Sequence, residues 1–126
     1  MHFAKLHVSA ETTSRLRSLR QRTLLTPNLL CRIALMVSLE EGPLGATMQP
    51  DSDGMEFNAY TLTGDAHESF MAILRWVEAQ GRERDGDMPS DDELLVALKA
   101  HIQRGVTILA ARVRSPADVA RLAIVG

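Results

Sequence analysis

The chain has 126 residues, of which 45% are hydrophobic and 24% charged, and its formal net charge is −2. This size and composition predict one globular domain spanning residues 1–126, with a core large enough to fold without disulfides or a structural metal. Its one cysteine excludes an internal disulfide and cannot supply the thiolates of a zinc or iron–sulfur site. No apolar run approaches the ~20 residues that span a bilayer, and no signal-peptide pattern opens the chain. We therefore expect a cytoplasmic protein with no membrane association and no cofactor.

Charge is distributed unevenly along the chain. Residues 1–40 hold six basic and two acidic side chains, a net +4; residues 41–93 hold three and thirteen, a net −10; residues 94–126 hold five and one, a net +4. Such segregation suggests a surface that faces a polyanion, although solvated helix faces produce the same counts more often.

The first third of the chain predicts a strand followed by two helices. Residues 3–8 alternate between the two sides of an extended chain, which is typical of a short strand. Ser9 is a suitable N-cap for a helix over residues 10–22. Thr26-Pro27 begins a second helix that runs to Glu40 and is apolar nearly all round. A small monomer cannot cover such a helix on every side, so the pattern predicts self-association.

Residues 45–59 form an acidic, irregular connection in the sequence. A loop of this length is unusual within a compact domain, so the segment is a candidate for a role beyond connection. Its stretch from Asp51 to Glu56 superficially resembles a calcium loop, but the ligand number and spacing of an EF-hand are not met, and we interpret it as a turn. Residues 60–62 are expected to be extended.

Three further helices are predicted in the second half of the chain. Each begins at residues suited to capping: Asp65 with Glu68 for residues 66–80, Ser90 with Glu93 for a long helix to about Arg114, and Ser115-Pro116 for a final short helix. The long helix carries one continuous apolar stripe, and its Gly105 lets a neighbouring helix approach closely. The predicted fold is mainly α, with a short N-terminal strand followed by a helical bundle.

Catalytic motifs are absent from the sequence. It has no Gly-rich phosphate loop, no paired histidines at metal spacing and no nucleophile elbow, and its four histidines are scattered. We therefore predict no catalytic residues, no metal ligands and no enzymatic activity. Cys31 allows two interpretations: a buried side chain that fills a small gap, which is favoured, or a reactive thiolate beside Arg32.

Basic residues border the first predicted helix. On a helical projection Arg15 and Arg22 lie on one flank, and Arg17 and Arg20 lie on the other. The second helix begins immediately afterwards with unpaired backbone N–H groups, and a helix N-terminus beside arginines can bind phosphate. An ordinary solvated face is about equally compatible with these residues alone. The predicted phosphate contacts are Lys5, Arg15, Arg17, Arg20, Arg22, Asn28 and Arg32.

The order strand, helix, turn, helix is also that of ribbon-helix-helix proteins, in which a dimer forms a two-stranded ribbon that reads the major groove. A ribbon-helix-helix-like N-terminal part would place Phe3, Lys5 and His7 against the groove. Aromatic residues make up only 4% of the chain, which disfavours a stacking platform for single strands. Double-stranded DNA, held by its phosphates, is therefore the expected target.

Three stretches carry a resemblance to a known family: LHVSAETTSRLRSLRQRTLLTPNLLCRIALMVSLEE, GMEFNAYTLTGD and HIQRGVTILAARVRSPADVA. On these stretches the sequence resembles the DndE family of DNA sulfur modification proteins, and the resemblance extends over almost the whole chain. The resemblance implies a small, mainly helical protein of a bacterial DNA phosphorothioation system, in which sulfur replaces a non-bridging phosphate oxygen. It also implies a DNA-binding, oligomeric subunit that works beside a cysteine desulfurase, an iron–sulfur protein and an ATPase-like subunit.

The leading hypothesis is a non-enzymatic subunit that forms a homo-oligomer, such as a tetramer, through its second helix and holds duplex DNA by the backbone. Three alternatives remain open. The first is a scaffold that docks its acidic middle on partner enzymes without touching DNA. The second is a ribbon-helix-helix repressor with base preference, and the third is a sulfur-relay enzyme that uses Cys31.

Overall fold

The computed structural model of the chain describes residues 5–44, 49–82 and 88–125. The protein is mainly α, as predicted. Its elements in chain order are β1 (Lys5–His7), α1 (Ala10–Thr23), α2 (Pro27–Glu40), β2 (Glu56–Asn58), α3 (Ala59–Thr63), the 3-10 helix η1 (Gly64–Ala66), α4 (His67–Gln80), α5 (Asp91–Arg112) and α6 (Pro116–Val125).

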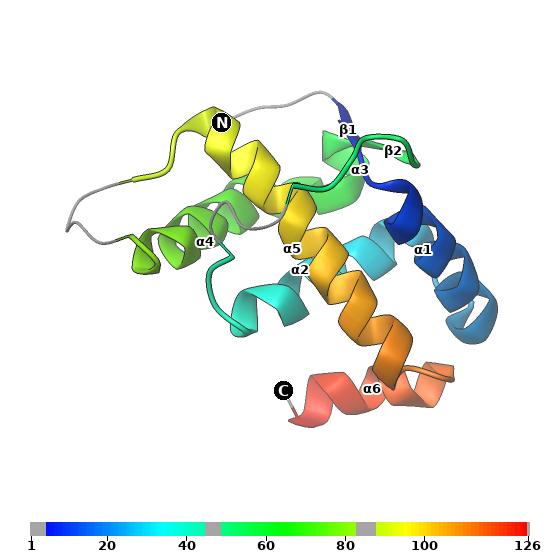
Figure 1. The fold of residues 1–126 in the computed structure, drawn as a ribbon. Helices are drawn as coiled ribbons and strands as arrows, with labels where there is room; N and C mark the ends of the chain where they lie inside the picture. Colours follow the sequence, from blue (N-terminus) through cyan, green and yellow to red (C-terminus); the bar gives the residue numbers. More distant parts are fainter. Residues whose placement is uncertain (1–4, 45–48, 83–87, 126) are drawn as a thin grey trace.

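α5 is the central helix of the fold. It packs against α2, α1 and α4, and Figure 1 shows it crossing the molecule between α1 and α4. The predicted apolar stripe faces these neighbours and is buried at Leu94, Leu98, Ile102, Val106 and Leu109. By length and composition α5 could span a membrane, but half of its apolar window is buried inside the protein, as is usual for the core helix of a helical domain.

The N-terminal strand pairs within its own chain. β1 and β2 form a two-stranded antiparallel sheet, with Leu6 opposite Phe57 and His7 opposite Glu56. Leu6 and Phe57 point into the core, so that their strand neighbours, including Lys5 and His7, lie on the exposed face. The order strand, helix, helix agrees with the sequence, but β1 has a partner in the same chain rather than in a second copy. Phe3, which was expected beside them, lies outside the described residues.

Local capping explains where α1, α2 and α5 begin. The side chain of Ser9 accepts from Thr12 N, that of Thr26 accepts from Leu29 N, and Ser90 forms a complete capping box with Glu93. All three starts were predicted, and α5 ends two residues before the predicted Arg114.

Two expectations for the middle of the chain were wrong. Residues 60–62 are helical within α3, and the extended piece is β2, where pairing with β1 overrides the irregular pattern of the sequence. The predicted cap of Asp65 with Glu68 does not form, because η1 precedes α4 and places Ala66 at the N-cap position without a side-chain hydrogen bond.

The described part of the acidic 45–59 segment is tied to the start of α1. Asp51 Oδ1 accepts from Ala10 N at 3.1 Å and from Asp53 N at 2.9 Å, and these backbone donors, Asp53 first, lower the pKa of the Asp51 carboxyl group. Gly54 N donates to Val8 O at 2.9 Å. Asp51 therefore acts as a turn and cap residue, in agreement with the turn interpretation; residues 45–48 lie outside the described part.

Candidate nucleic-acid interface

α1 presents two arginines on its solvent side. Leu16 and Leu19 bury the inner face of this helix, so that Arg17 and Arg20 are exposed on the outer face. Together with Gln21 they border a shallow surface hollow. Neither guanidinium group has an ion pair or hydrogen bond within the described residues, and a guanidinium group in this state is a ready donor to phosphate oxygens.

Lys5 and Arg15 are already paired with carboxylates at the surface. Lys5 Nζ lies 3.7 Å from Glu56 Oε1, with 64% of the lysine side chain exposed. Arg15 pairs with Glu11 one turn earlier in α1. Exposed pairs of this kind contribute little to stability, so both cations are able to exchange their carboxylate for a phosphate.

Arg22 and Arg32 serve the fold. The Arg22 guanidinium donates to Ala110 O at 3.0 Å and Val113 O at 3.3 Å, at the end of α5 where carbonyl groups lack helical partners. Arg32 donates through Nε to Leu62 O at 2.7 Å and through its terminal nitrogen to Thr61 O at 2.9 Å. The sequence could not reveal these acceptors, because they lie 88, 91, 30 and 29 positions away.

The start of α2 is less open than the sequence suggests. Asn28 is half-buried, and its Oδ1 is buried without a hydrogen-bond partner in the described part of the chain. The first-turn N–H of Leu29 donates to Thr26 Oγ1 at 3.3 Å. The geometry therefore groups Arg17 with Arg20 and leaves Asn28 at the margin.

Two exposed arginines that the sequence reasoning did not select are Arg112 and Arg114. They lie at the end of α5, in the segment to which Arg22 of α1 donates. The signal that could have found them is the net charge of +4 in residues 94–126. The structure thus brings basic residues from both ends of the sequence to one region.

Cys31 is buried in α2. Its side chain is fully enclosed, and desolvation raises the pKa of the thiol to about 12. A thiol with this pKa is protonated at neutral pH and has no access to a partner molecule. The favoured interpretation, a small side chain that fills the core, is confirmed, and the sulfur-relay alternative loses its support.

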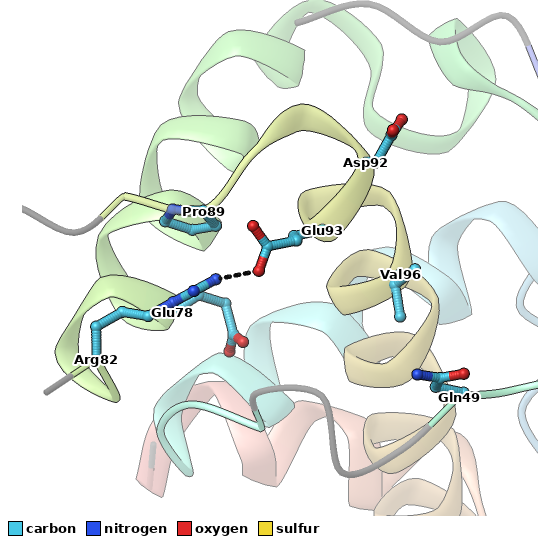
Figure 2. A pocket seen from close by; sticks show the side chains of 7 residues that line it. All are labelled: Gln49, Glu78, Arg82, Pro89, Asp92, Glu93 and Val96. Atoms are coloured by element: carbon cyan, nitrogen blue, oxygen red, sulfur yellow. Dashed lines mark hydrogen bonds and ion pairs between the residues drawn. The ribbon is translucent and has the colours of Figure 1, made fainter.

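A concave site lies away from Arg17 and Arg20, between the end of α4 and the start of α5 (Figure 2). Arg82 donates to Glu93 Oε2 at 2.7 Å beside this hollow, and the Ser90 backbone N–H and the Arg82 side chain lower the pKa of Glu93 to about 2. The other residues that line this hollow are Gln49, Glu78, Pro89, Asp92 and Val96. This surface is acidic and is not suited to DNA.

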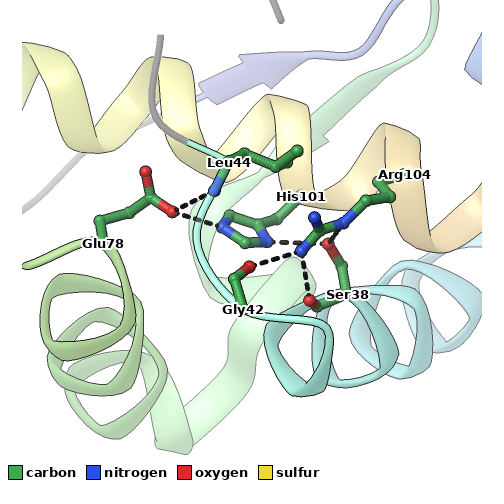
Figure 3. Close-up of polar contacts among 6 residues, drawn as sticks. All are labelled: Ser38, Gly42, Leu44, Glu78, His101 and Arg104. Carbon is green, nitrogen blue, oxygen red and sulfur yellow. Dashed lines mark hydrogen bonds and ion pairs between the residues drawn. The ribbon is translucent and has the colours of Figure 1, made fainter. Parts of the chain in front are cut away.

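Glu78 also belongs to a buried polar network that the sequence did not reveal (Figure 3). His101 Nε2 lies 2.9 Å from Glu78 Oε2, and its Nδ1 lies 2.8 Å from Ser38 Oγ. Arg104 Nε donates to Ser38 Oγ at 2.9 Å. A neutral His101 that donates from Nε2 and accepts from the Ser38 hydroxyl satisfies every group.

Serine, histidine and glutamate in this order also occur in hydrolases. Here Ser38 and His101 are fully buried, with no exposed side-chain surface, and the Ser38 hydroxyl is held by Arg104. A substrate carbonyl therefore cannot reach the hydroxyl. The role that the geometry supports is structural, because the network ties α2, α4 and α5 together. Within the described residues there is also no cluster of three or more potential metal ligands.

Comparison with known proteins identifies the family. The family model for DNA sulphur modification protein DndE matches residues 5–117. The chain belongs to the DndE family. This membership connects the protein with DNA sulfur modification, and it suggests that other proteins of such a system are its partners.

Two solved structures show the same fold as this DndE-family chain. The crystal structure of DndE from Escherichia coli B7A, a protein involved in DNA phosphorothioation modification, is 23% identical, covers 86% of this chain and 98% of its own, and superposes with a TM-score of 0.72. The crystal structure of a DndE G21/24K mutant involved in DNA phosphorothioation is 21% identical, covers 87% and 99%, and has a TM-score of 0.66. No match was found among curated protein sequences.

Proposed function

We propose that this protein is a non-enzymatic DNA-binding subunit of a bacterial DNA phosphorothioation system, which holds the duplex backbone while partner enzymes carry out the sulfur chemistry. The observation that carries the proposal is the pair Arg17 and Arg20, exposed and unpaired among the described residues on the outer face of α1. Guanidinium groups bind phosphate oxygens through two parallel hydrogen bonds, and phosphate contacts dominate affinity for DNA.

The remaining predicted contacts have graded roles in this proposal. Lys5 and Arg15 exchange a surface carboxylate for phosphate. Asn28 contributes at the margin of the interface. Arg22 and Arg32 act first by holding α1 to α5 and α2 to α3 through backbone carbonyl groups.

A homo-oligomer, such as a tetramer, is part of the proposal. α2 packs on α5 along one side, yet Leu29 remains 39% exposed and Met36 55% exposed on the other, with Ile33 half-buried between them. Burying apolar side chains of this kind against a second copy is favourable by about 25 cal/mol per Å². Such assembly multiplies the arginine pairs that a single DNA duplex meets.

The partners in this proposal are the other proteins of the system: a cysteine desulfurase, an iron–sulfur protein and an ATPase-like subunit. This chain supplies no catalytic group to them. The alternative of a scaffold without DNA contact predicts no duplex binding, and the alternative of a repressor predicts that unrelated duplexes differ strongly in affinity at equal salt.

A salt titration of duplex binding tests the proposal. Fluorescence anisotropy with a labelled duplex, between about 50 and 200 mM salt, measures log K against log salt concentration. The double variant Arg17→Gln with Arg20→Gln should weaken binding and reduce the slope by about 2 for each chain in contact, because each lost phosphate contact removes about 0.9 from it. Arg82→Gln, which removes a cation on the other side of α5, is the matched control.

Two results would contradict the proposal. A wild-type affinity that does not change with salt would exclude phosphate contacts as its source. A double variant that keeps the wild-type affinity and slope would remove Arg17 and Arg20 from the interface.

A further inference from the structure

α4 and Met88, which precedes α5, form an apolar surface that the described part of the chain leaves uncovered. Ile73 is 50% exposed, Trp76 63% and Met88 49%. Trp76 and Met88 line a shallow hollow together with Glu68, and Ile73 lies on the same side of the helix, three residues before Trp76. We name Glu68, Ile73, Trp76 and Met88 the α4 face.

An exposed tryptophan in such surroundings is unusual for a surface helix. Tryptophan has one of the largest apolar areas of any side chain, and it is normally buried for most of that area. Contiguous exposed apolar groups mark interaction sites more often than chance, and tryptophan is enriched among the residues that dominate binding energy at interfaces.

The charges beside the α4 face are arranged so that negative groups remain available. Arg75, which lines the same hollow, lies 3.2 Å from Asp91, and Arg82, two residues after the end of α4, lies 2.7 Å from Glu93, so both arginines are already paired. Figure 2 shows the second of these pairs, with Asp92 outside it. Glu68, which lines the hollow, is exposed and has no ion pair within the described residues; Asp92 is likewise exposed and unpaired there, and it follows Asp91, the partner of Arg75.

Charge also excludes two occupants of this surface. DNA would meet unpaired carboxylates, which repel phosphate. A second copy of the chain, docked by the same face in a symmetric dimer, would offer Glu68 only the residues that line this hollow, and their one cation among the described residues, Arg75, is already paired with Asp91. Glu68 of each copy would then be desolvated without a free cation, which is unfavourable.

We propose that the α4 face is the docking site for a basic, apolar-faced segment of a partner protein, whose apolar side chains cover Trp76, Ile73 and Met88 and whose lysines or arginines pair with Glu68 and Asp92. This proposal rests on the proposed function, because the partner is another protein of the DNA sulfur-modification system. Figure 1 shows α4 and α1 on different sides of α5, so the partner and the duplex bind at the same time.

Binding of purified proteins tests the proposal. The full-length chain is immobilised, and the cysteine desulfurase, the iron–sulfur protein and the ATPase-like subunit of the same system are passed over it in turn. Trp76→Ser and Glu68→Lys should each weaken the binding of at least one of these proteins by about tenfold or more. Leu24→Ser and Asp53→Lys are matched controls, because Leu24 is 83% exposed and Asp53 is an exposed acid, and neither belongs to the α4 face.

The outcomes separate this proposal from its alternatives. If none of the three proteins binds, or if both α4-face variants bind as tightly as the wild type, the proposal is wrong. If Trp76→Ser lowers the oligomer mass in light scattering, the face belongs to a contact between copies and the proposal is also wrong. Circular dichroism identifies any variant that fails to fold, and Glu68→Lys, an exposed substitution, keeps the test decisive in that case.

DNA affinity is measured on the same variants. The α4-face variants should bind the duplex as the wild type does. A wild-type chain that binds a partner through Trp76 but binds no DNA would refute the proposed DNA-binding function and leave the docking site intact. The reverse pattern, salt-dependent DNA binding without any Trp76-dependent partner, would refute the docking site alone.

Discussion

At Gly105 α5 passes very close to the backbone of α2, and this contact allows the packing of the core to be tested. A Cβ atom added at this position would lie 1.9 Å from the carbonyl oxygen of Ala34 and 2.4 Å from its carbonyl carbon. Ordinary van der Waals contact begins near 3.4 Å, so the two helices would have to separate by about 1.5 Å. We therefore predict that Gly105→Ala destabilises the protein.

The expected magnitude follows from two opposing effects. Forcing a methyl group into a packed helix crossing costs about 1–3 kcal/mol, and the upper end applies because the obstacle is rigid backbone. Alanine returns about 1 kcal/mol through its higher helix propensity. The net loss is about 2 kcal/mol, which is a large part of the roughly 5–15 kcal/mol that stabilises a typical domain.

Urea unfolding followed by circular dichroism measures this loss as a lower midpoint with an unchanged slope. Thr107→Ala, two residues further along α5 on its exposed side, is the control and should change stability by less than about 0.5 kcal/mol. Because the clash is with the Ala34 carbonyl group, adding Ala34→Gly should not restore stability. A Gly105→Ala variant as stable as the wild type would show that α2 and α5 do not cross at this distance.

Three further predictions concern buried groups. Burial lowers the pKa of His101, and the hydrogen bond with Glu78 only partly offsets this shift, whereas His101 of the unfolded chain takes up a proton at the ordinary pKa near 6.5. Stability should therefore be complete above about pH 6.5 and fall as the pH drops below it. Urea midpoints measured at several pH values should depend less on pH in the variant His101→Gln. Arg32→Gln leaves the carbonyl groups of Leu62 and Thr61 without their donor, so the free energy of unfolding in urea should fall by about 1–2 kcal/mol. Duplex affinity should stay within about twofold of the wild type. A large loss of affinity without a loss of stability would make Arg32 a direct contact. Cys31 should resist alkylation by iodoacetamide in the folded protein and react only in urea, and rapid labelling without denaturant would contradict its burial.

The sequence predicted those parts of the fold that depend on neighbouring residues. The starts of α1, α2 and α5 depend on Ser9, Thr26 and Ser90, whose side chains accept from N–H groups three residues ahead, and such pairs are visible in the order of residues. α4 does not begin in this way, because the turn before it is a 3-10 helix, and the expected cap was therefore wrong.

The parts that the sequence could not predict depend on contacts between distant segments. β2 is a strand because β1, about fifty positions earlier, pairs with it. The network of Ser38, Glu78 and His101 joins three helices, and no spacing rule connects residues so far apart. The same limit applies to the candidate interface, where spacing selected Arg17 and Arg20 but could not distinguish them from Arg22, whose partners are carbonyl groups of α5.

Arg22 also explains how charge that is segregated along the chain becomes segregated in space. By holding the end of α1 to the end of α5, it brings the basic first third of the sequence to the exposed Arg112 and Arg114 of the basic last third. Glu68 belongs to α4, which lies on the other side of α5 from α1 (Figure 1). Under the proposed function, a DNA duplex would attract the basic end of this arrangement and repel Glu68, so that the chain would approach with α1 forward. Reversing the charge of Arg17 and Arg20 should therefore slow association more than it speeds dissociation, which stopped-flow anisotropy at low salt would measure directly.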